Sequence, residues 1–197
     1  MTEDTPISLL QRLRHRPHDA DWRRLIDLYS PLISRWLLGF GLRQSDVDDL
    51  SQDVLQALVR EVSSFQHNGH SGAFRRWLRV TMVHRLKGFW RNRRTENQLT
   101  GWDAEMTLER MEDPNSDPNL LWDQEHDQYV VHKLLQLVEP QFTASSWAAF
   151  QRQVLDGCKA SAVAEELGIS VNAVLIAKSR VLQALRQEAK GLVELDG

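Results

Sequence analysis

Apolar residues recur at intervals of three and four positions along most of the chain, which is the spacing of one face of an α-helix. The first such stripe spans residues 22–40, the second spans residues 47–58 and the third spans residues 74–89. We expect Ser45 or Asp46 to cap the second helix, because short polar side chains accept hydrogen bonds from free backbone N–H groups there. No run alternates for long enough to predict a strand.

The helical pattern resumes in the C-terminal half. Stripes at 130–138 and 147–154 predict two helices, and residues 160–189 predict two more on either side of Gly168-Ile169-Ser170. Between the halves lies MEDPNSDPN, where prolines oppose helix and like charges extend the chain. The sequence therefore predicts an all-α fold of two small helical domains joined by an acidic linker. The expected boundaries are 1–19 for an N-terminal extension, 20–96 for the first domain, 97–127 for the linker, 128–190 for the second domain and 191–197 for a tail.

Charge is segregated in a way that the net charge of −3 hides. Residues 75–94 carry eight bases and no acid, whereas residues 103–127 carry nine acids and a single base. Bases neutralise phosphate, and interleaved rings can stack on unpaired bases, so the basic segment suits nucleic acid. Phe74 and Trp77 are expected in the core, whereas Trp90 is a candidate for stacking. The acidic segment is expected to be a solvated spacer, with the alternative that it folds over the basic helix.

Residues 161–186 have the features of a helix-turn-helix. Ala164 is small where two helices would cross, Gly168 tolerates positive φ in the turn, and Ser170 can cap the second helix. If the unit binds DNA, the second helix lies in the major groove and reads base edges or phosphates. If it is only an α-hairpin, the same polar residues form a solvated face.

Several classes of function lack support in the sequence. Cys158 is the only cysteine, so neither an internal disulfide nor a cysteine-rich zinc site is expected. His67 and His70 lack the further ligands of a metal site, and no catalytic triad or phosphate loop occurs. The N-terminus lacks the basic head and apolar run of a secretory signal, and no stretch is apolar enough to span a membrane. We expect a cytoplasmic protein that is not an enzyme and needs no cofactor or metal.

Three segments, in this order, resemble the sigma-70 family. DVDDLSQDVLQALVREVSSF resembles the region 2 motif D-x-x-D-L-x-Q-x-x-F, and FRRWLRVTMVHRLKGFWRNRR resembles the part that follows, with Trp77 at the tryptophan position. LGISVNAVLIAKSRVLQALR resembles the region 4 helix-turn-helix. The resemblance covers about residues 20–94 and 128–190. No block between them resembles region 3, which points to the extracytoplasmic-function (ECF) class.

This resemblance implies a sigma factor that binds core RNA polymerase and directs initiation from the minus-10 and minus-35 promoter elements. Whether an anti-sigma factor is a further partner stays open. The implied polymerase-binding residues are Asp46, Asp49, Leu50, Gln52 and Asp53. The implied minus-10 residues are His67, Asn68, His70, Arg79, His84, Arg85, Lys87, Trp90, Arg91, Arg93 and Arg94. The implied minus-35 residues are Ser170, Asn172, Leu175, Lys178, Ser179 and Arg180.

The sequence also departs from the family pattern. Ala173-Val174-Leu175-Ile176 stands where members usually have Thr-Val followed by Lys or Arg, and Val83-His84-Arg85 replaces a common Ala-Arg-Asn. Two rival interpretations remain at this point. One is a helix-turn-helix regulator that binds DNA without polymerase, and the other is an interaction module whose basic helix binds an acidic partner.

Overall fold

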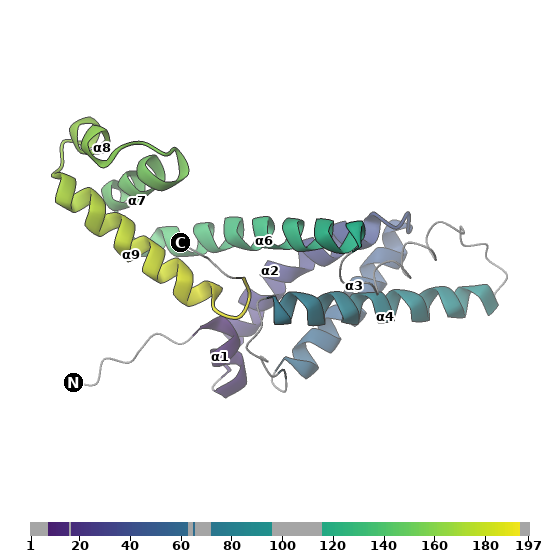
Figure 1. The fold of residues 1–197 in the computed structure, drawn as a ribbon. Helices are drawn as coiled ribbons and strands as arrows, with labels where there is room; N and C mark the ends of the chain where they lie inside the picture. The colour runs from purple at the N-terminus through teal and green to yellow at the C-terminus, as the bar shows by residue number, and fades with distance from the viewer. Residues whose placement is uncertain (1–7, 16, 63–64, 66–71, 96–115, 194–197) are drawn as a thin grey trace.

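A computed structural model describes residues 8–15, 17–62, 65, 72–95 and 116–193 of the chain (Figure 1). These residues are mostly helical and contain no strand, as predicted. The helices are α1 Leu9–His15, α2 Asp19–Leu38, α3 Gln44–Glu61, α4 Ala73–Thr95, α6 Asp117–Val138, α7 Ala144–Phe150, α8 Ala160–Leu167 and α9 Val171–Ala189. A short 3-10 turn at Glu139–Gln141 contains Pro140 and ends α6, and a π turn at Gln151–Leu155 follows α7.

Helices α2, α3 and α4 bury the three apolar stripes seen in the N-terminal half of the sequence. α3 starts earlier than expected, with Arg43 at the capping position, so Ser45 and Asp46 lie inside its first turn. The side chain of Gln44 donates a hydrogen bond of 2.8 Å to Asp48 one turn later, which supports the earlier start.

Helix α1 lies in the segment predicted to be an extension. It is only seven residues long, and a helix of that length is not stable by itself in water. Leu9, Leu10 and Leu13 are buried, and α1 packs on α2. Each buried leucine contributes roughly 1.5–3 kcal/mol, so tertiary packing holds this helix.

Helix α6 begins inside the segment predicted to be the linker. Residues 117–127 are helical, with Ser116 at the capping position and a proline in the first turn, where its missing N–H costs nothing. A proline that was expected to oppose helix formation therefore stands in the first turn of a helix. Trp122, His126 and Val130 lie on the buried face of α6.

One apolar core joins the two halves of the chain. It runs from Leu9 to Val193, and Trp122 of α6 packs edge-on against Trp36 of α2 at 5.2 Å between ring centroids. In Figure 1, α6 lies beside α4, and α9 runs diagonally from the α7–α8 end towards the N-terminal helices. A second, smaller core lies within the α7–α9 unit.

None of the described helices, taken singly, is long and apolar enough to cross a bilayer. The bent pair formed by α8 and α9 passes the test by length and composition only.

Candidate nucleic-acid interface

Helices α8 and α9 form a helix-turn-helix. Their axes differ in direction by 107°, within the range usual for this motif. Gly168 has φ 64° and ψ 32°, so the turn uses the left-handed conformation predicted for it. The hydroxyl of Ser170 accepts a 3.1 Å hydrogen bond from the backbone N–H of Ala173, which confirms the predicted cap. Val163, Ala164 and other small apolar residues fill the angle between the helices.

The outward face of α9 carries most of the residues predicted to contact the minus-35 element. Ser170, Asn172, Leu175, Ser179 and Arg180 are exposed, and Lys178 is half-buried. Arg152, in the π turn, forms exposed ion pairs of 2.8 Å with Asp156 and 3.0 Å with Glu166 of α8. The hydrogen bonds to Glu166 and Asp156 raise the pKa of Arg152 above its ordinary value. These ion pairs connect the π turn to α8, the first helix of the motif.

The basic helix α4 divides into exposed and buried bases. His84, Arg85 and Arg91 are exposed along its outer side, and Lys87 is half-buried. The side chain of Trp90 is 8% exposed and packs against Phe40, so its ring is not presented for base stacking. This corrects the interpretation of Trp90 as an outward ring.

Two arginines of α4 are paired with the carboxylates of α6. Arg75 contacts both Asp123, at 2.9 Å, and Asp127, and Arg79 contacts Asp123 at 3.4 Å. Burial lowers the pKa of Arg79, whose side chain is almost fully covered. Arg79 is thus held inside the molecule rather than displayed to DNA. Asp123 and Asp127 belong to the acidic segment, so at this end the segment does lie on the basic helix.

A buried histidine extends this contact to α2. His126 Nε2 lies 3.4 Å from the hydroxyl of Tyr29, and its Nδ1 lies 2.9 Å from Asp127. Burial lowers the pKa of His126, and it raises the pKa of Tyr29. Burial opposes ionisation of Asp127, but hydrogen bonds from His126 and Arg75 outweigh it and lower the pKa of that carboxyl. The pattern of acids and bases along the sequence does not indicate this α2–α4–α6 network, because its members lie far apart in the chain.

The predicted polymerase-binding residues fall on both sides of α3. Asp49, Gln52 and Asp53 are exposed on one outer face. Leu50 is buried in the core, and Asp46 is buried as well. The structure therefore brings three of the five predicted residues onto one surface, and the other two face the interior of the protein.

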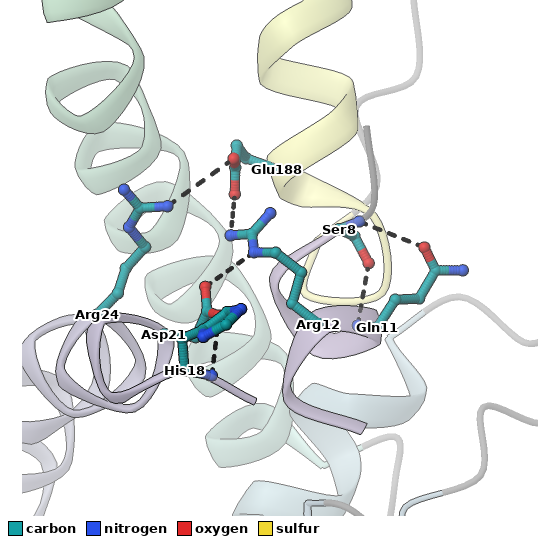
Figure 2. A network of polar contacts seen from close by, with 7 residues as sticks. All are labelled: Ser8, Gln11, Arg12, His18, Asp21, Arg24 and Glu188. Carbon is teal, nitrogen blue, oxygen red and sulfur yellow. Dashed lines mark hydrogen bonds and ion pairs between the residues drawn. The ribbon is translucent and has the colours of Figure 1, made fainter. Parts of the chain in front are cut away.

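The N-terminal helix holds the end of α9 against α2. Figure 2 shows Arg12 between two carboxylates, donating at 2.8 Å to Asp21 and at 3.2 Å to Glu188. Arg24 of α2 approaches Glu188 at 4.0 Å. Burial lowers the pKa of Arg12, but these two carboxylates outweigh it and raise that pKa. The contact links α1, α2 and α9, which sequence spacing could not reveal.

Some predicted residues lie outside the described part of the chain. His67, Asn68 and His70 are among them, and the side chains of Arg93 and Arg94 are likewise not described. Within the described residues, no group of three metal-binding side chains occurs.

The α2–α4 bundle is similar to a known protein family. Residues 25–96 match the family model described as Sigma-70 region 2. The matched residues make up about a third of the chain and include none of α6–α9. A search of curated proteins found no similar sequence.

Proposed function

We propose, from the match of residues 25–96 to the sigma-70 family, that the chain is a sigma factor of the ECF class. In this proposal it binds core RNA polymerase through the exposed acidic face of α3. It contacts the minus-10 element through α4 and the minus-35 element through α9. A cytoplasmic location follows from this role.

One observation carries the proposal. The region 2 match is followed, in the same chain, by a helix-turn-helix whose second helix has an exposed outer face. Only one long helix, α6, and the segment before it separate the two units, which supports the ECF class. A regulator that acts without polymerase would need the helix-turn-helix but would have no use for a region 2 domain.

Transcription with purified components tests the proposal. Core RNA polymerase and the full chain are incubated with genomic DNA fragments, and run-off transcripts are mapped. We expect transcripts that start at defined positions and require the chain. Specific DNA binding by the chain without any polymerase-dependent start would overturn the proposal and favour the polymerase-independent regulator.

A further inference from the structure

The outward face of α9 is more apolar than its position suggests. Val171, Leu175 and Ile176 are 44%, 48% and 43% exposed. They occupy the first two turns of the helix, directly after the Ser170 cap. Single exposed apolar side chains are ordinary, but neighbouring ones on a protruding face indicate a contact surface.

The helical spacing places these residues on the side of α9 that points away from the small core of the α7–α9 unit. Val171 and Leu175 are four residues apart and lie on one side of α9, with Ile176 beside them. Val174 and Ala177, which lie on the opposite side, are buried in the small core of the α7–α9 unit. The three exposed side chains therefore lie outside that small core.

The charge around this face favours a nucleic acid over a protein partner. No acid occurs in α9 between Val171 and Gln187, whereas Lys178, Arg180 and Arg186 are basic. Phosphates can approach such a helix without repulsion, and bases at its sides neutralise them. An apolar face whose own helix carries only positive charge up to Gln187 suits the floor of a DNA groove.

The major groove offers one apolar group to such a face, the 5-methyl group of thymine. We propose that Val171, Leu175 and Ile176 read thymine methyl groups in the upstream promoter element. The inference rests on the proposed function, and it names what α9 selects. Asn172 is exposed on the same face, and an asparagine side chain pairs with the N6 and N7 edge of adenine. The apolar and the amide contacts thus both favour A·T pairs.

Replacement of thymine by deoxyuridine tests this reading, because it removes the methyl group and leaves the pairing edges intact. The polymerase with the full chain bound first selects duplexes from a pool randomised in the upstream element. Each thymine of the selected element is then replaced singly. We expect the affinity to fall about fourfold for each methyl group that α9 contacts, the effect of exposing one methyl-sized group.

Two variants assign the effect to α9. Leu175→Ser should bind the thymine and deoxyuridine duplexes equally at one or more of the sensitive positions. Leu121→Ser changes an equally apolar side chain, 57% exposed on α6, and should keep the full discrimination.

The outcomes separate this inference from the proposed function. Promoter-specific initiation that is indifferent to every upstream deoxyuridine overturns the methyl reading and leaves the sigma-factor proposal standing. A methyl effect that persists in Leu175→Ser and in the matching Val171→Ser and Ile176→Ser variants also overturns it. Failure of the parent chain to direct any promoter-specific start overturns the proposed function and the inference with it.

Discussion

Tyr29, His126 and Asp127 form a hydrogen-bonded series whose members need particular protonation states. With Asp127 ionised, Nδ1–H of His126 donates to it, which leaves Nε2 to accept from the Tyr29 hydroxyl. A second proton on His126 would remove that acceptor and place a charge in the core. Burial lowers the pKa of His126 for this reason.

Acidification should therefore destabilise the fold. The unfolded chain, with a histidine pKa of about 6.5, binds more protons than the folded chain once the pH falls below that value, so the free energy of unfolding falls. Asp123, Asp127 and Arg75 face this imidazole. The pKa of Asp127 is lowered from 3.8, so its stabilising contribution is present above that pH and is lost only at lower pH.

Between pH 7 and 5, the unfolding temperature should fall more in the parent than in His126→Gln, measured by circular dichroism. Equal falls would exclude His126 as the cause.

The Ser170 cap gives a second prediction at this scale. Ser170→Ala leaves the N–H of Ala173 without its side-chain acceptor, so the free energy of unfolding should fall by about 1 kcal/mol. Ser161→Ala, in the exposed first turn of α8, is the matched control and should change it by less than about 0.5 kcal/mol. Urea titration measures both, and equal effects would contradict the assigned cap.

At the scale of elements, the parts of the fold set by local chemistry could be predicted from the sequence. The α8–α9 turn is an example, because Gly168 and Ser170 act on their own neighbours. α1 could not be predicted from its sequence, since its seven residues are helical only through burial against α2. Trp90 is different, because its spacing from Met82 and Leu86 already placed it on the buried stripe of α4. The eight bases of the same segment favoured instead the interpretation of Trp90 as a ring that stacks on nucleic acid.

The turn between α8 and α9 should be sensitive to a single methyl group. Gly168→Ala introduces no collision, since nothing lies within 4 Å of the added carbon. Its cost is the left-handed backbone, about 1–2 kcal/mol for an L-residue. Gly168→Asn should lose less, because asparagine tolerates this conformation better. Chemical denaturation checks the order, which a loss from Asn as large as that from Ala would contradict.

The exposed face of α3 gives a prediction about polymerase. Asp49→Arg with Asp53→Arg reverses two exposed charges without touching the core, so the chain should fold normally and bind core polymerase at least tenfold more weakly, as expected for about 1.4 kcal/mol. Asp19→Arg with Asp27→Arg makes the same charge change on exposed positions of α2 and should bind like the parent. Pull-down at low salt measures both, and parent-like binding by the α3 variant would remove this face from the proposal.

At the scale of the whole molecule, both candidate DNA-binding units are held in one body. The apolar core passes from α2 through α6 to α9, the carboxylates of α6 hold Arg75 and Arg79, and Arg12 joins Glu188 to Asp21. The acids on α6 therefore have two effects. They stabilise the packing of α6 on α4, and they neutralise part of the positive charge of the basic helix.

These two effects can be separated by removing the charge of α6 while keeping its shape. Asp123→Asn with Asp127→Asn leaves Arg75 and the buried Arg79 without carboxylate partners, so the free energy of unfolding should fall by roughly 1–3 kcal/mol. The same change removes two negative charges from beside the basic helix, so affinity for duplex DNA should rise and its dependence on salt should steepen by about one to two counterions. Asp117→Asn with Glu125→Gln removes equal charge from α6 outside these ion pairs and should change stability much less. Salt titrations measure the DNA binding of each variant, and urea titrations measure its stability. If both pairs of substitutions alter binding and stability alike, net charge alone accounts for the result. The contact between α6 and α4 then does not restrain the basic helix.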